Sequence, residues 1–411
     1  FGNKLIATIV DGATFEWDSD ATGATSTRAT IVANAPTATR QTLVSTPDRH
    51  LVFFGTETTI GTTSTQDDMF IRWSDQESID ASTSYAPSAT NTAGTQRLAD
   101  GTRIIAAIRG RDAIYVWTDH ALFIMRFVGA PFVFSFQQVG TGCGLIGKNA
   151  AVEVDGSAYW MSENGFFRYT GKLESLACLV EDYVFDDINT VPRNHIFAGL
   201  NNLFGEVTWF YPGSGAASNN RSVTYNYMDS TAERPVWTTS TLARSSWSDS
   251  HVFGKPHGTE YDSDATSDST VGNTDGVSIY YEHETGNNQI KAGSASAIAA
   301  SIESGDFDIS AVQGGGADLR GDGEYMMKIR RVLPDFLQQT GDARVTLNLK
   351  NYPTDSQASS SLGPFTSTTS TTKIDTRARA RAISLKVDNT STGQHWKLGT
   401  FRLDIQADGR R

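Results

Sequence analysis

Four short strands in immediate succession are the most constraining feature of this chain. Residues 104–136 contain apolar runs at Ile104–Ile108, Ala113–Trp117, Ala121–Phe127 and Phe132–Phe136, separated by turn residues. Aromatic and β-branched residues suit a half-buried pleated surface, and turns at such short intervals leave no room for crossover helices. The sequence therefore predicts an antiparallel meander here.

The same pattern returns 44 positions later. Tyr115–Phe123 has the sequence YVWTDHALF, and Tyr159–Phe167 has the sequence YWMSENGFF. A period of this length that holds four antiparallel strands is typical of a β-propeller blade. We therefore predict that residues 1–320 form an all-β, propeller-like domain of four-stranded blades. Two polar stretches, residues 75–101 and Gly258–Gly276, are predicted to be surface loops.

A change of pattern follows the glycine run at residues 314–316. Ala343–Lys350 and Thr400–Ile405 alternate between apolar and polar residues, which predicts strands with one wet face. Residues 321–411 are therefore predicted to form a second domain, an antiparallel β-sandwich or barrel that serves as a docking platform.

The charge is distributed unevenly between these two segments. Residues 322–411 hold 14 Lys and Arg against 9 Asp and Glu, a net charge of +5. The preceding 321 residues hold 20 against 37, a net charge of −17. An acidic body argues against binding of DNA through phosphate contacts, because such binding needs clustered basic charge.

No apolar run approaches the roughly 18 residues that a membrane helix needs, so no membrane association is expected. Cys143 and Cys178 are the two cysteines of the chain, and this number favours free thiols in a reducing compartment over a disulfide framework.

Motifs for catalysis or metal binding lack the context that they need. Gly142–Gly147 fits the GxGxxG spacing, but a phosphate site requires a following helix, and a strand hairpin is predicted there. An EF-hand loop beginning at Asp262 fails at positions five and twelve, which are Thr266 and Asn273. We therefore expect no enzymatic activity, no cofactor and no metal site.

Three arginines at alternate positions, which we call the arginine ladder, are the clearest candidate for a functional surface. Alternation places all three on one strand face, and the same face is predicted to continue as Ile383, Leu385 and Val387. Guanidinium groups in such a row are either solvated or paired with acids, and the second case would make them a subunit interface. The ladder consists of Arg377, Arg379 and Arg381.

Several short motifs occur in a fixed order along the chain. Besides the arginine ladder, they are Arg72-Trp-Ser-Asp75, Ile114–Trp117, Leu122–Arg126, Gly129-Ala-Pro-Phe-Val-Phe134, Val332-Leu-Pro-Asp-Phe336, Trp396-Lys-Leu-Gly399 and Asp408-Gly-Arg-Arg411. Together these motifs resemble the tail nozzle family of short-tailed bacteriophages, whose members are also called packaged-DNA stabilisation or tail tubular proteins.

The resemblance implies a structural virion protein of the phage tail, assembled in the bacterial cytoplasm. It implies a propeller-like domain and a platform domain that assemble as a hexameric ring below the portal and adaptor, next to tail fibre or needle proteins. Such a ring retains packaged DNA and opens for ejection, and DNA passes without specific binding. Candidate residues for the constriction lie in the loop Gly258–Gly276, namely Asp262, Asp264, Asp268 and Asp275.

Two alternatives stay open from the sequence. A carbohydrate-binding or host-recognition propeller of a phage tail would use exposed aromatic residues such as Trp237, Trp247 and Tyr280. A propeller glycosidase would need a pair of carboxylates at a set separation, which the sequence does not define.

Overall fold

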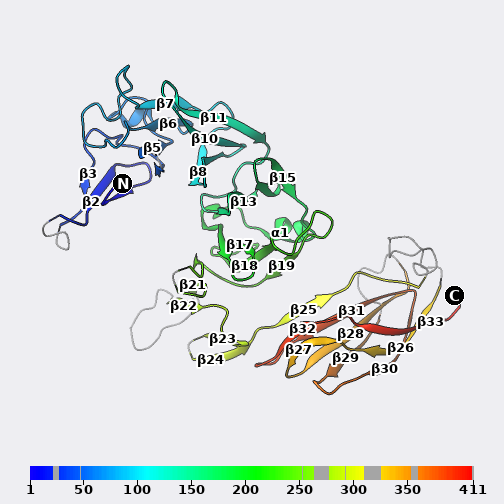
Figure 1. Cartoon of the computed structure of the whole chain (residues 1–411). Coiled ribbons are helices and arrows are strands. Elements are labelled where there is room, and N and C mark those ends of the chain that lie inside the picture. The colour runs from blue at the N-terminus through cyan, green and yellow to red at the C-terminus, as the bar shows by residue number, and fades with distance from the viewer. Residues whose placement is uncertain are drawn as a thin grey trace. The chain divides into compact units, whose positions relative to one another are not determined.

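The computed structural model describes residues 1–21, 27–46, 48–251, 253–262, 277–291, 293–309, 325–352 and 360–409. The chain divides into two compact units, Phe1–His283 and Glu284–Arg411. Both are built from antiparallel strands (Figure 1), so the predicted all-β fold is confirmed. In the described part, helix is confined to α1 (Glu181–Asp187) and two 3-10 turns, Thr63–Thr65 and Arg193–His195.

The first unit consists of sheets in which strands that follow one another along the chain pair with each other. The first sheet holds β1 (Lys4–Thr8), β2 (Thr14–Asp18) and β3 (Thr30–Ile31). The second holds β4 (Gln41–Ser45), β5 (His50–Phe54), β6 (Phe70–Trp73) and β7 (Gly94–Arg97). The third holds β8 (Ile104–Arg109), β9 (Ile114–Thr118), β10 (Ala121–Gly129) and β11 (Val133–Thr141).

Three more sheets complete this unit with the same order of pairing. The fourth holds β12 (Ala151–Val154), β13 (Ser157–Ser162), β14 (Gly165–Tyr169) and β15 (Leu173–Leu176). The fifth holds β16 (Phe197–Asn201), β17 (Glu206–Tyr211), β18 (Arg221–Asn226) and β19 (Trp237–Ser240). The sixth holds β20 (Ser246–Ser248), β21 (His257–Asp262) and β22 (Val277–Glu282).

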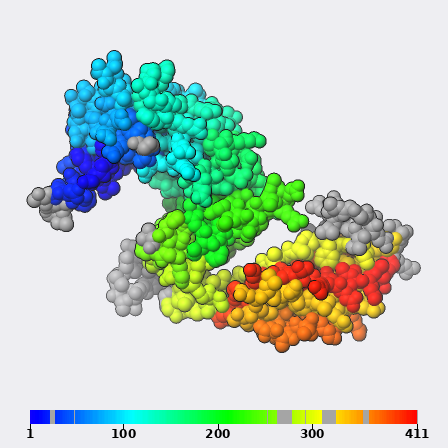
Figure 2. Space-filling view, viewed as in Figure 1, coloured from blue at the N-terminus to red at the C-terminus, as the bar shows by residue number. Residues whose placement is uncertain are grey.

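The sheets follow one another around an open curve, as the colour order from blue to green shows in Figures 1 and 2. The first strand of each sheet contacts the first strand of the next, from β1 through β4, β8, β12 and β16 to β20. A parallel bridge between Asn149 and Phe197 links the fourth and fifth sheets close to the starts of β12 and β16. Sheets joined through their first strands are the arrangement of propeller blades.

The 44-residue repeat corresponds to equivalent places in two neighbouring sheets. Leu122 pairs with Trp117 in the third sheet, and Phe166 pairs with Met161 in the fourth. Each of these four residues is buried, and the 44-residue offset relates Trp117 to Met161 and Leu122 to Phe166. The prediction that the repeat encodes successive four-stranded units is therefore confirmed for these sheets.

Tryptophans on the second strands of three successive sheets form the centre of the main core. Trp117, Trp160 and Trp209 are fully buried, and the rings of the first two lie edge to face at 5.4 Å. The indole N–H of Trp160 donates to the carbonyl of Cys143 (2.8 Å), and that of Trp209 donates to the carbonyl of Ala150 (3.0 Å). Trp160 and Trp209 thus bury a large apolar area and satisfy their indole donors on connecting segments, whereas the buried indole N–H of Trp117 has no hydrogen-bond partner in the described part of the chain.

The GxGxxG segment is a packed connection between the third and fourth sheets, as the sequence context predicted. A Cβ on Gly144 would lie 2.1 Å from the carbonyl oxygen of Asp119, and one on Gly147 would lie 2.3 Å from that of Arg193. The strand β12 follows, in place of the helix that a phosphate site requires. These glycines therefore permit close approach of backbone segments.

The prediction of a surface loop at residues 75–101 is wrong in two respects. The segment contains β7, which pairs with β6, and its Ile79 and Tyr85 are buried in a small core with Phe53. The buried Arg72 donates from Nη1 to the carbonyl of Tyr85 (2.9 Å) and thereby fixes the segment. Ile79 and Tyr85 are isolated apolar residues in a polar stretch, so they form no periodic pattern from which their burial could be predicted.

The second unit has the layered arrangement of a β-sandwich. Alternate residues of β28 (Ala343–Lys350) are buried, and Met327, Ile329 and Val332 of β26 (Met327–Leu333) share one core with them and with Ala378 and Ile383. One sheet has the order β25 (Ala300–Glu303), β31 (Ala382–Asn389), β28 and β29 (Ser360–Ser367). The other has the order β30 (Ile374–Ala380), β26 and β33 (Arg402–Ala407). The described residues also form two two-stranded sheets, the hairpin of β23 (Asn288–Lys291) with β24 (Ser294–Ala297) and the long-range pair of β27 (Phe336–Thr340) with β32 (His395–Leu398).

The two units separate after His283, earlier in the chain than the predicted boundary after residue 320. The reason is β25, which pairs with β31 and therefore belongs to the sheet of the second unit. The glycine run on which the boundary was predicted lies outside the described residues.

Candidate functional site

The arginine ladder lies at the end of β30 and at the point where the chain leaves that strand. Arg377 and Arg379 are exposed on β30, and the alanines that follow each of them, Ala378 and Ala380, are fully buried in the sandwich core. Arg381 lies between β30 and β31, and its backbone N–H donates to the carbonyl of Lys350 (3.1 Å). The predicted alternation of arginine outside and alanine inside therefore holds over β30.

The predicted continuation of the arginine face into an apolar face is wrong. The chain changes sheets at Arg381, because β30 pairs with β26 and β31 pairs with β28. Ile383 is buried in the same core as the two alanines, and Val387 is also buried. Even-numbered residues therefore face inward before the crossing and odd-numbered residues after it. A break between two strands cannot be read from an uninterrupted alternating sequence.

Ion pairs occupy part of the solvent face of this sheet. Arg379 bonds to the carboxylate of Asp408, and Nε of Arg331 donates to Oδ1 of Asp375 (2.9 Å). Lys373 lies 3.0 Å from the other oxygen of Asp375. The hydrogen bonds from Arg331 and Lys373 hold the pKa of the Asp375 carboxyl below its usual value. These exposed pairs orient the side chains and add little stability.

Of the four acidic residues predicted for a constriction, only Asp262 belongs to an element that the structure describes. Gly258 to Asp262 belong to β21, which pairs with β22, so the start of the predicted loop is a strand. Asp264, Asp268 and Asp275 lie outside the described residues, and the side chain of Asp262 does as well.

Trp237 and Trp247, which a carbohydrate-binding propeller was predicted to use, pack at different places in the first unit. The indole N–H of Trp237 donates to the carbonyl of Ala177 (2.8 Å), and its ring packs on Trp209. Trp247 donates to the carbonyl of Leu200 (2.7 Å) and lies over Gly199, where an added Cβ would collide with the indole. Both side chains thus contribute to packing between neighbouring sheets.

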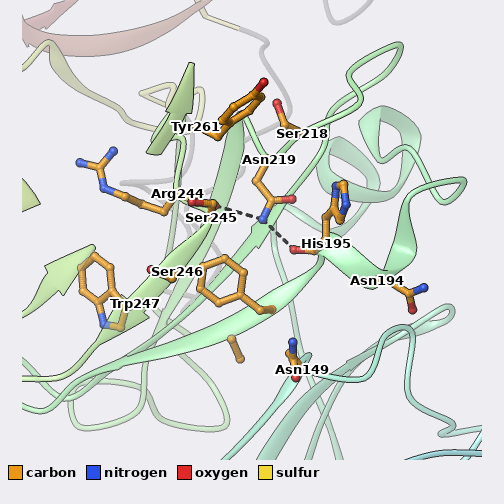
Figure 3. A pocket seen from close by; sticks show the side chains of 12 residues that line it. Asn149, Asn194, His195, Ser218, Asn219, Arg244, Ser245, Ser246, Trp247 and Tyr261 are labelled. Atoms are coloured by element: carbon orange, nitrogen blue, oxygen red, sulfur yellow. Dashed lines mark hydrogen bonds between the residues drawn. The ribbon is translucent and has the colours of Figure 1, made fainter. Parts of the chain in front are cut away.

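A cavity of about 510 Å³ lies between the fifth and sixth sheets of the first unit (Figure 3). Its wall combines neutral polar side chains with aromatic rings. The sequence analysis missed it, because its residues come from five separate segments that share no motif. The lining residues are Asn149, Asn194, His195, Phe197, Ala198, Ser218, Asn219, Arg244, Ser245, Ser246, Trp247 and Tyr261.

Asn219 holds two walls of this cavity together. Its amide Nδ2 donates to the carbonyls of His195 (2.7 Å) and Arg244 (3.1 Å), the bonds drawn as dashed lines in Figure 3. Its Oδ1 is buried and has no hydrogen-bond partner within the described part of the chain. Loss of this side chain would leave two carbonyls without donors, so its first role is structural.

The Arg244 side chain extends away from Asn219 and into the sixth sheet (Figure 3). Its guanidinium lies 4.0 Å from the ring centroid of Tyr281 and donates from Nε to Nε2 of His283 (2.9 Å). Glu260 lies 3.5 Å from its Nη1. Burial, with the guanidinium nearby, lowers the pKa of His283 to about 4, so this imidazole is neutral near pH 7.

The described residues contain no cluster of three or more His, Cys, Asp or Glu side chains suited to a metal ion. No helix in this part of the chain is long and apolar enough to cross a membrane. Both cysteines are free thiols, and burial raises the pKa of Cys178 to about 11.

Comparison of the chain with models of known protein families and with curated proteins gave no match.

Proposed function

We propose that this protein is a structural component of a bacteriophage tail, a tail nozzle subunit. In this role it would form a ring, hexameric in the family that the sequence resembles, which continues the portal and adaptor channel. The ring would retain packaged DNA and open during ejection, next to tail fibre or needle proteins. The proposal includes no catalytic step and no cofactor.

One observation carries the proposal. A series of blade-like antiparallel sheets, joined through their first strands, is followed by a β-sandwich that presents exposed arginines. This order of a propeller-like body and a second β unit agrees with the plan that the sequence resemblance implies. An all-β scaffold of this kind suits a rigid channel component, because closely packed interiors transmit force without large deformation.

The charge of the first unit is consistent with a conduit for DNA. Phe1–His283 contains 18 Lys and Arg against 32 Asp and Glu, a net charge of −14. Like charge repels phosphate over a distance on the order of the Debye length, about 8 Å at physiological salt. A wall with this sign would let DNA slide, whereas Lys and Arg contacts would hold it.

Electron microscopy of phage particles that carry an epitope-tagged copy of the chain tests the proposal. We expect antibody label at the tail, at the end of the channel distal to the portal. Particles assembled without the protein should package DNA and then lose it, so nuclease digestion should remove most of the DNA that wild-type particles protect. Label on the head, or undiminished protection, would contradict the proposal.

DNA binding provides a second test on the isolated chain. We expect negligible affinity for random duplex DNA at about 150 mM salt, because the first unit is acidic. Tight binding that weakens steeply with salt would mean that the protein grips DNA, in contradiction to a passive channel.

The cavity between the fifth and sixth sheets favours one other function, recognition of a host saccharide. Amide and hydroxyl groups beside aromatic rings are suited to neutral polyhydroxyl ligands. Binding on a glycan array by the wild-type chain, with loss in Asn194→Ala, would support it. Asn202→Ala, whose side chain lies outside the cavity lining, serves as the control. Equal binding by Asn194→Ala and wild type would exclude this cavity.

A further inference from the structure

The solvent face of the sheet β30-β26-β33 concentrates positive charge. A register irregularity between Ile329 and Arg331 shifts the alternation of β26, so that Ile329 and Val332 are buried while Arg330 and Arg331 both lie outside the core. Arg377 lies within the same irregularity on the neighbouring strand β30, between the paired residues Asp375 and Ala378. A local bulge therefore leaves two successive arginines of β26 outside the core, which no strictly alternating pattern would predict.

The strand register also places like charges opposite each other. Lys328 on β26 pairs with Arg379 on β30. Directly opposed like charges destabilise a sheet unless something neutralises them. Asp408 bonds to Arg379, but Lys328, Arg330 and Arg377 have no carboxylate partner among the residues that the structure describes. We call these three side chains the basic face.

The strands beneath the basic face are held rigidly. Ile329, Val332, Ala378 and Ala380 lie directly under it and are buried in the sandwich core. Packing therefore fixes the backbone positions from which the cationic side chains extend, which lowers the part of the entropy cost of binding that comes from ordering the backbone. A preorganised set of unpaired cations is suited to an anionic surface.

Carboxylates on the same sheet favour an acidic protein surface over a nucleic acid. Asp375, Asp404 and Asp408 lie on or beside the solvent face of these strands. They would repel an unbroken row of phosphates, but they suit a protein surface that carries both signs. The first unit of this chain is such a surface, with a net charge of −14.

The surface of α1 in the first unit has complementary chemistry. Glu181, Asp182 and Asp186 have no cationic partner within the described chain, whereas the neighbouring Asp187 pairs with Arg221 (3.1 Å). Tyr183 is exposed beside these carboxylates. A guanidinium can pair with a carboxylate and stack on an aromatic ring at once, which lysine does less well.

We propose that the basic face of one copy binds the α1 surface of a second copy of this chain. The inference rests on the proposed ring, because it assigns one of the contacts that would build it. Two different patches make the contact heterologous, and such a contact repeats from subunit to subunit and closes into a ring when the rotation permits. Charge pairing of this kind sets register and partner choice more than it adds affinity.

Sedimentation velocity of the full chain, at low and high salt, measures this contact. We expect wild-type chains to self-associate at about 50 mM salt and to dissociate as salt rises, because exposed pairs are screened. Arg330→Glu with Arg377→Glu should weaken association about tenfold or more, and so should Asp182→Lys with Asp186→Lys. A mixture of these two variants should associate again, because each supplies the charge that the other lacks.

Matched controls separate this contact from a general charge effect. Lys397→Glu reverses an exposed cation on β32, and Asp229→Lys with Glu233→Lys reverses two exposed acids outside α1. These variants should associate as wild type does, and circular dichroism should show that all variants are folded. Unaltered association of the Arg330 and Arg377 variant, or no recovery in the mixture, would overturn the inference. Binding of duplex DNA through the basic face would also overturn it.

These experiments distinguish a failure of the second-copy contact from a failure of the proposed nozzle function. If association survives the charge reversals but the protein still labels the tail of the particle, the inference fails and the nozzle function stands. If the tail is not labelled but the mixture restores association, the second-copy contact stands without the ring function.

Discussion

Removal of the Gln41 side chain should weaken the joint between the second and third sheets. Gln41 on β4 donates from Nε2 to the carbonyl of Ala107 on β8 (2.7 Å) and accepts from the backbone N–H of Ala107 at Oε1 (2.8 Å). β8 is an edge strand of its sheet, and Ala107 is buried. One side chain thus supplies both hydrogen bonds to backbone groups that would otherwise face no partner.

The expected cost follows from these two bonds. Each hydrogen bond contributes roughly 0.5–1.5 kcal/mol, and a buried group left without a partner costs roughly 1–3 kcal/mol. We therefore expect Gln41→Ala to lower the free energy of unfolding of the first unit by about 2–4 kcal/mol. Gln41→Met keeps most of the volume and removes both bonds, so it should cost nearly as much.

Urea unfolding followed by tryptophan fluorescence is the suitable assay. Seven of the eight tryptophans lie in Phe1–His283, so the signal reports mainly on the first unit. With a slope of about 2 kcal/mol per molar urea, the midpoint should fall by about 1–2 M. Gln96→Ala, on the exposed end of β7, should change stability by less than about 0.5 kcal/mol. A Gln41→Met variant as stable as wild type would refute the role of the hydrogen bonds.

Three further outcomes are expected. Replacing the arginine ladder by alanine should leave the chain folded by circular dichroism and reduce its incorporation into phage particles; normal incorporation would argue against an interface there. Hydrogen bonds from His50 and Ser45 lower the pKa of the buried Asp48 despite desolvation. The ionised Asp48 carboxylate therefore stabilises the fold above its unfolded pKa of about 3.9, and this stabilisation is lost as pH falls through the lower pKa of the folded state. Asp48→Asn should therefore flatten the pH dependence of the free energy of unfolding in acid. Gly144→Ala should cost about 1–3 kcal/mol because its Cβ would meet the backbone of Asp119, whereas Gly305→Ala, with open space around it, should be nearly neutral.

The sequence by itself determined the strands, because their signal is local. The apolar runs between residues 104 and 136 are β8 to β11, and the 44-residue repeat predicts equivalent register positions in two sheets. Ala343–Lys350 is β28 with the bounds that its alternation predicts. A strand with one wet face shows its period in consecutive residues, so nothing beyond the segment is needed to detect it.

Only the tertiary structure decided which strands meet. The crossing at Arg381 moves the chain from one sheet to the other without any interruption of the alternating pattern. The placement of both Arg330 and Arg331 outside the core depends on a register shift between strands. The cavity around Asn219 joins segments that are far apart in the chain. Pairing partners and bulges are set by contacts between distant residues, and a local pattern cannot encode them.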